Sequence, residues 1–130
     1  VNPSDEYQPG ARRFDVGEKG NALLAGTIAG LEQLREWGVA SIAESLAGIN
    51  ERIARGVTEL GLRVASPQLR CPHMFGARIP ERFTGDLIAA LREREVYVSR
   101  RGQSLRFSPH LHVEDADIER LLSALRELLR

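Results

Sequence analysis

The segment 39–60 combines a helical period with a length that requires a partner surface. Its apolar residues recur every three or four positions: Val39, Ile42, Ala43, Leu46, Ile49, Ile53, Val57 and Leu60. Charged residues such as Glu44 and Arg55 fill other positions, as in an amphipathic helix with one buried face. Gly61 follows where the helix would end, because glycine tolerates the left-handed backbone there. The sequence therefore predicts a helix of about six turns that packs on another element.

Two further segments show the same period. Residues 22–36 form the first, with Asn21 as the expected cap and Gly38 as the stop. Residues 114–129 form the second, and their acidic start favours a helix N-terminus. The apolar face of this last helix would consist of Ile118, Leu121, Leu122, Leu125, Leu128 and Leu129. We expect this last helix to bury that face against the rest of the fold.

The region between the second and the last helix contains runs with a period of two, which predict strands. Residues 62–66 alternate before Pro67, and residues 73–79 form another strand-like run between two prolines. We expect these two strands to pair. A short helix capped by Thr84 follows, and a hairpin then joins strands at 96–99 and 104–108 through a turn at 101–103.

The order of these elements predicts an α+β fold. Two long helices precede a ββαββα unit, which is most simply built as a mainly antiparallel sheet with helices on one face. Residues 1–12 are polar, contain two prolines and lack periodicity, so we expect an extended lead-in. Residues 13–130 then form one domain of ordinary size.

Composition excludes several classes of function. Eighteen basic residues balance eighteen acidic ones, which removes the usual electrostatic footprint of a nucleic-acid-binding protein. We find no apolar run of the roughly 20 residues that a membrane span requires. Cys71 is the only cysteine, which fits a reducing, cytoplasmic environment. The chain opens on Val1 without a signal-like segment, and we expect it to be a piece of a longer protein.

Few residues suggest catalysis. His73, His110, His112 and Cys71 form no recognised metal-ligand spacing, so no metal site is expected. His110 and His112 lie two apart and would face one way in an extended segment. Neither Cys71 nor the serines stand in a nucleophile motif. The turn from Gly17 to Gly20 is either a tight turn or a weak anion site at the start of a helix.

Arg106 is the strongest candidate for binding. It stands in Leu105-Arg106-Phe107, where strand alternation places the two apolar side chains on one face and the guanidinium on the other. A rigid strand would hold the cation in place, and the planar guanidinium suits bidentate recognition of a carboxylate. A solvated arginine on an exposed sheet face is the alternative interpretation.

Two motifs resemble class V aminotransferase-like proteins, which include cysteine desulfurases, kynureninases and isopenicillin epimerase-like enzymes. The closing segment of this chain is similar to the end of the family's chains. It runs from Val96-Tyr97-Val98-Ser99 through Leu105-Arg106-Phe107-Ser108-Pro109-His110-Leu111 and continues with Glu114-Asp115-Ala116-Asp117-Ile118. Near the start, Arg13-Phe14-Asp15-Val16-Gly17 followed by Asn21 is similar to the element that precedes the small domain. Together these motifs cover essentially residues 11–130.

The resemblance implies that this chain is the carboxyl-terminal small domain of a pyridoxal-phosphate enzyme of fold type I. Such enzymes are usually homodimers with active sites between the large and small domains, and Arg106 matches the arginine that binds the substrate's α-carboxylate. Glu18 and Asn21 occupy positions near the family's cofactor-phosphate contact, although the family's threonine is replaced by Glu18. His112-Val113-Glu114 also departs from the usual Tyr-Asn-Thr.

The resemblance also implies that the large domain supplies the cofactor lysine. That domain is absent from this sequence, and Lys19, the only lysine, stands outside the family's cofactor motif. We therefore expect no catalytic residue in this chain and no activity from it alone. The substrate would be an amino acid, and the reaction could be transamination, β-elimination, hydrolytic cleavage or racemisation. The alternatives are a regulatory domain that binds a small molecule and a plain dimerisation domain.

Overall fold

The computed structural model of the chain describes residues 9–14, 20–81, 83 and 85–130. The chain divides into two compact units, Val1–Glu36 and Trp37–Arg130. The residues of the first motif from Asp15 to Lys19, and the expected cap Thr84, lie outside the described residues.

The first unit contains two helical elements. A short 3-10 helix, η1, spans Gly10–Phe14, and the helix α1 begins at Asn21 and ends at Trp37. The side chain of Arg13 closes η1 by donating from its Nε to the carbonyl of Gly10 at 2.9 Å. The predicted helix at 22–36 is confirmed, whereas the prediction of an extended lead-in is wrong from Gly10 onward because a turn forms there instead.

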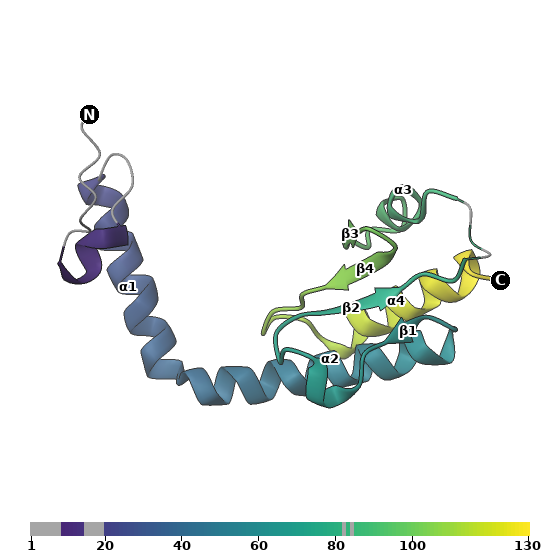
Figure 1. Cartoon of the computed structure of the whole chain (residues 1–130), viewed down its shortest axis with the longest axis horizontal. Coiled ribbons are helices and arrows are strands. Elements are labelled where there is room, and N and C mark those ends of the chain that lie inside the picture. The colour runs from purple at the N-terminus through teal and green to yellow at the C-terminus, as the bar shows by residue number, and fades with distance from the viewer. Residues whose placement is uncertain (1–8, 15–19, 82, 84) are drawn as a thin grey trace. The chain divides into compact units, whose positions relative to one another are not determined.

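The second unit holds the predicted ββαββα arrangement after a long helix (Figure 1). Its elements are α2 at Val39–Glu59, β1 at Arg63–Val64, η2 at Pro67–Leu69, β2 at Phe75–Arg78, α3 at Leu87–Arg92, β3 at Ser99–Arg101, β4 at Ser104–Phe107 and α4 at Asp115–Leu128. The predicted α+β class is confirmed. None of the helices in the described part of the chain combines the length and the apolar character needed to cross a membrane.

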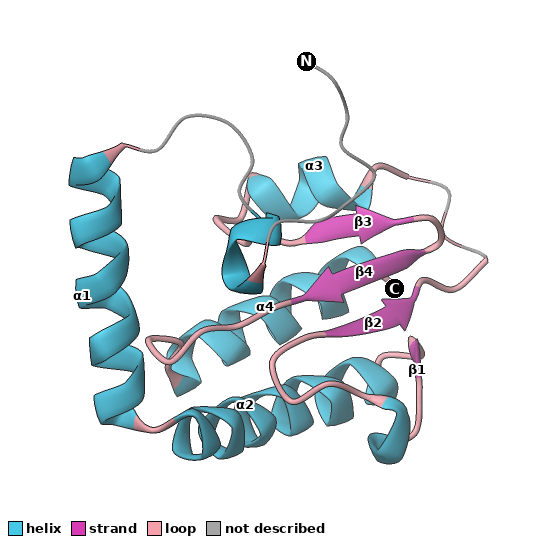
Figure 2. Ribbon diagram, turned by 60° about the vertical axis from the view of Figure 1, so that its left-hand side comes forward, coloured by secondary structure: helices cyan, strands magenta, loops and turns pink. Residues whose placement is uncertain are grey.

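The four strands form one antiparallel sheet in the order β1-β2-β4-β3 (Figure 2). The predicted pairing of the first two strands is confirmed, with Val64 opposite Ala77. The predicted hairpin between β3 and β4 is confirmed as well. Gly102 stands in its turn with a φ of 56°, a left-handed conformation that glycine adopts without strain.

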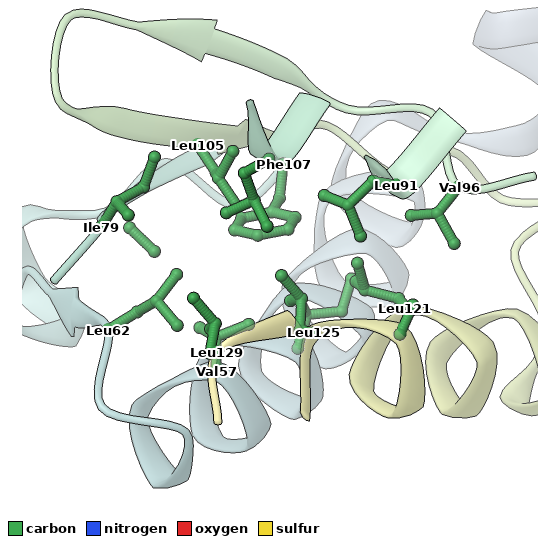
Figure 3. Packing of buried hydrophobic residues seen from close by; sticks show 14 of the residues in the cluster. Val57, Leu62, Ile79, Leu91, Val96, Leu105, Phe107, Leu121, Leu125 and Leu129 are labelled. Carbon is green, nitrogen blue, oxygen red and sulfur yellow. The ribbon is translucent and has the colours of Figure 1, made fainter. Parts of the chain in front are cut away.

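One face of the sheet forms the core with α2, α3 and α4. Along β4, Leu105 and Phe107 are buried while Ser104 and Arg106 are only partly covered, and β2 alternates in the same way. The buried cluster around these strands includes Val57, Leu62, Ile79, Leu91, Val96, Leu121, Leu125 and Leu129 (Figure 3). Helices α2 and α4 approach closely, since a Cβ at Gly56 would overlap the side chain of Leu122.

Two boundaries differ from the sequence-based expectation. The strand expected at 96–99 begins only at Ser99, because the backbone N–H of Val96 donates to the Leu91 carbonyl at 3.0 Å and closes the end of α3. Helix α3 is capped by Asp86, whose Oδ1 accepts from the backbone N–H groups of Ile88 and Ala89. An aspartate at this position satisfies two N–H groups that have no partner within the helix.

Candidate functional site around Arg106

Arg106 lies in the middle of the sheet, on the face opposite the core. Strand register places it directly between Gly76 on β2 and Ser99 on β3. Directly opposed residues of antiparallel strands share a face, so the guanidinium has two small neighbours beside it. This placement follows from the alternation of Leu105, Arg106 and Phe107, and the predicted orientation of the arginine is confirmed.

The guanidinium of Arg106 lacks an acidic partner among the described residues. Its Nε is buried and has no hydrogen-bond acceptor there. By contrast, ion pairs join Arg52 to Asp115, Arg70 to Glu51, Arg78 to Glu81 and Arg94 to Glu127. A buried donor without an acceptor costs about 1–3 kcal/mol. An acceptor supplied from outside this unit would remove that cost.

A cavity of about 570 Å³ opens beside Arg106, within the unit Trp37–Arg130. Its walls come from the segment before β3, from β4 and the loop after it, and from the first turns of α4, with Ile53 of α2 behind them. This volume falls in the range of pockets that bind small molecules, about 300–1,000 Å³. The cavity thus lies beside a cation that has no acidic partner in the part of the chain that the structure describes.

Aromatic rings border the same cavity. Tyr97 contributes to the wall and is 77% exposed. His110 and His112 also contribute, and their rings stack with centroids 5.6 Å apart. The prediction that these two histidines face one way is confirmed. Sequence analysis did not single out Tyr97, because this residue lies before β3 and no local pattern signals its place at the cavity.

Two acidic residues, Asp117 and Glu95, also line the cavity. Asp117 belongs to the capping box of α4, where its Oδ2 accepts from the backbone N–H of Glu114 at 3.0 Å. Glu95 has a φ of 58° and follows α3 in a left-handed conformation that side chains other than glycine rarely adopt. Arg120 of α4 lines the cavity as well and is exposed.

The other candidate residues lie elsewhere. Glu18 and Lys19 are outside the described residues, and Asn21, the expected cap, is the first residue of α1. Cys71 is exposed and forms an isolated bridge with Met74, and it does not line the cavity. Over residues 9–14, 20–81, 83 and 85–130, no three histidine, cysteine or acidic side chains gather as metal ligands would.

Several solved structures share this fold. A NifS-like protein superimposes with a TM-score of 0.76 at 16% identity, over 95% of this chain and 38% of that one. The apo cysteine desulfurase from Thermococcus onnurineus NA1 has a TM-score of 0.74 at 19% identity, over 92% and 34% of the two chains. For the alanine–glyoxylate aminotransferase from Nostoc sp. the TM-score is 0.68 at 18% identity, over 93% and 34%.

These matches concern the fold. No family model and no curated protein sequence matches the chain. The chain spans only 34–38% of the length of the three solved structures above. The predicted resemblance to part of a class V aminotransferase-like protein is confirmed at the level of the fold, because a NifS-like protein, a cysteine desulfurase and an aminotransferase contain this architecture within a longer chain.

Proposed function

We propose that this chain is the substrate-binding small domain of a pyridoxal-phosphate-dependent aminotransferase or lyase that acts on an amino acid. The observation that carries the proposal is the guanidinium of Arg106, which lines the cavity and whose buried Nε has no acceptor within residues 9–14, 20–81, 83 and 85–130. The fold that the chain shares with longer desulfurase-like and aminotransferase chains supports the same conclusion.

Arg106 would bind the α-carboxylate of the substrate. Its planar guanidinium offers two parallel N–H donors to the two carboxylate oxygens. Because Arg106 belongs to β4, the strand fixes its backbone and limits how far the guanidinium can move. The small neighbours Gly76 and Ser99 leave room for a carboxylate beside the strand. A fixed carboxylate leaves the α-carbon with few orientations, and holding reactants in one geometry is a large part of catalysis.

The cofactor would be held by another domain. Pyridoxal phosphate supplies an electron sink for the bound amino acid and is held in the resting enzyme by a lysine, and Lys19 is the only lysine of this chain. The described residues thus provide a carboxylate anchor without the lysine that holds the group. We therefore propose no catalytic residue here and no step through the cofactor. The companion domain, a homodimer and a cytoplasmic location belong to the same proposal.

A carboxylate anchor serves every reaction branch that the fold allows. Transamination, β-elimination, hydrolytic cleavage and racemisation all require that one bond of the α-carbon be oriented, and Arg106 would act identically in each. The choice among these branches depends on groups that contact the other bonds of the α-carbon. Those groups would belong to the companion domain.

A regulatory domain is the second candidate, and the cavity is the observation that favours it. A closed effector site would bind its ligand within this chain alone, with an affinity that needs no companion domain. A small domain would bind an amino acid weakly in isolation and far more tightly in the longer protein. Calorimetric measurement of amino-acid affinity for this chain and for the longer protein distinguishes a regulatory domain from a small domain. The mass of the chain in solution tests a simple dimerisation role.

The proposal is tested by Arg106→Ala in a longer protein that includes the cofactor domain. We expect substrate affinity to fall at least tenfold, as loss of a charge-assisted hydrogen bond worth about 1.5–3 kcal/mol implies, while cofactor affinity stays within about twofold. Arg120→Ala, an exposed arginine on the same cavity, is the matched control and should change both affinities little. Equal losses of substrate and cofactor affinity in Arg106→Ala would count against the proposal.

A further inference from the structure

Tyr97 presents a large ring to the Arg106 cavity. It is 77% exposed, although Val96 beside it is buried in the core at 8%. Ser99 lies opposite Arg106 in the sheet, and Tyr97, Ser99 and Arg106 all line the same cavity. Tyr97 therefore borders the space beside the guanidinium with most of its surface uncovered.

The two histidines form a second flat surface at this cavity. Ser108, His110 and His112 are exposed after the end of β4, and all three line the same cavity as the guanidinium. The two imidazoles stack with an angle of 28° between their planes. A stacked pair of this kind holds each ring in place and leaves an outer ring face for a ligand.

The remaining lining favours an uncharged ligand side chain. Val98 and Val113 are partly covered apolar residues of the wall. A second carboxylate on the ligand would meet Glu95 and Asp117 as well as Arg120, so the charges of the wall offer it no net attraction. An apolar ring instead covers exposed surface at Tyr97 and the valines.

We propose that the amino acid bound at Arg106 carries an aromatic side chain, whose ring packs against Tyr97 and the His110–His112 pair. This inference rests on the proposed role of Arg106 as the carboxylate anchor. Tyr97 is a specificity-determining residue in this arrangement, because offset or edge-to-face ring contacts add affinity beyond that of area burial alone. Arg106 fixes one end of the ligand and the rings select the other.

The inference is tested by nuclear magnetic resonance titrations of the whole 130-residue chain, labelled with ¹⁵N. L-phenylalanine, L-alanine and phenethylamine are added separately, and the amide signals of Tyr97, Arg106 and His112 are followed. We expect L-phenylalanine to bind roughly three- to tenfold more tightly than L-alanine. Phenethylamine, which lacks the carboxylate, should bind at least tenfold more weakly than L-phenylalanine.

Two variants locate the effect. Tyr97→Ala should bring the affinity for L-phenylalanine close to that for L-alanine and leave the affinity for L-alanine unchanged, a pattern that general destabilisation would not produce. Leu69→Ala is the matched control, because Leu69 is 80% exposed and does not line the cavity. It should leave both affinities unchanged.

The outcomes separate this inference from the proposed function. Equal binding of L-phenylalanine and L-alanine, with phenethylamine weaker, would overturn the aromatic preference and keep the carboxylate anchor. Tighter binding of L-glutamate than of L-phenylalanine would also overturn the preference. Phenethylamine binding as tightly as L-phenylalanine would overturn the role of Arg106. The titrations extend to ligand concentrations high enough to detect the weak binding expected of the isolated domain, so an absence of signal changes with all three ligands would overturn both.

Discussion

Replacing Arg106 with methionine should stabilise the ligand-free protein. Most arginines that contribute to a fold do so through ion pairs or hydrogen bonds, and their loss destabilises it. The buried Nε of Arg106 has no acceptor among the described residues, so the folded state carries the desolvation cost of that donor without a compensating bond. Methionine retains an unbranched apolar chain of similar length and introduces no buried donor.

The size of the effect follows from the burial of one donor. An unsatisfied buried donor costs about 1–3 kcal/mol. Because Arg106 is partly exposed, we expect Arg106→Met to raise the free energy of unfolding by about 1 kcal/mol. For a unit of the size of Trp37–Arg130, a gain of this size in the free energy of unfolding raises the melting temperature by about 4–8 °C. Thermal and urea denaturation followed by circular dichroism measure both quantities. A loss of stability of 1 kcal/mol or more in Arg106→Met would refute the reasoning.

Arg70→Met is the matched control for this experiment. The Nε of Arg70 is also buried and unpartnered, but its Nη2 donates to Glu51 Oε2 at 2.6 Å and its guanidinium lies 5.9 Å from the ring centroid of Phe75. Since Glu51 is 59% exposed, the pair contributes modestly, and we expect Arg70→Met to lose about 1 kcal/mol. Opposite signs for the two variants distinguish a binding arginine from a structural one.

Three further substitutions test the fold around the site. Glu95→Gly should add about 1 kcal/mol to the free energy of unfolding in urea, because glycine adopts the observed φ of 58° without strain; Glu95→Ala, which keeps the strain, should not. Leu105→Ala should remove about 2–5 kcal/mol, since Leu105 is fully buried, and a loss below 1 kcal/mol would contradict its placement. Arg63→Glu should gain about 0.2–1 kcal/mol by facing Arg78 across the strands, and a loss in low salt would contradict that register.

Local periodicity was sufficient to predict most elements of the fold. The apolar stripe at 39–60 became α2 within one residue, because a long amphipathic pattern has only one way to bury its face. The start of β3 was misplaced because the branched residues Val96 and Val98 favour a strand. In the structure, the N–H of Val96 instead donates to Leu91, a tertiary choice that propensity does not encode.

The candidate site was predicted in part. Strand alternation predicted the face of Arg106. The two histidines do stack, but around a turn and not along the extended segment that their spacing suggested. The cavity itself depends on Ile53 of α2 and Asp117 of α4 meeting the end of β4, contacts between segments far apart in the sequence. No local sequence pattern predicts such contacts. Tyr97 therefore became a candidate only once the residues that line the cavity were known.

The side-chain Nε–H resonance of Arg106 offers the most direct measurement, with the ¹⁵N-labelled chain titrated with L-alanine and, separately, with ethylamine, the same molecule without its carboxylate. A carboxylate anchor requires that this resonance shift with L-alanine and stay unmoved with ethylamine, because only the former supplies the acceptor that the buried Nε lacks. If this resonance does not shift with L-alanine, or shifts equally with both ligands, the proposal that Arg106 binds the substrate is contradicted.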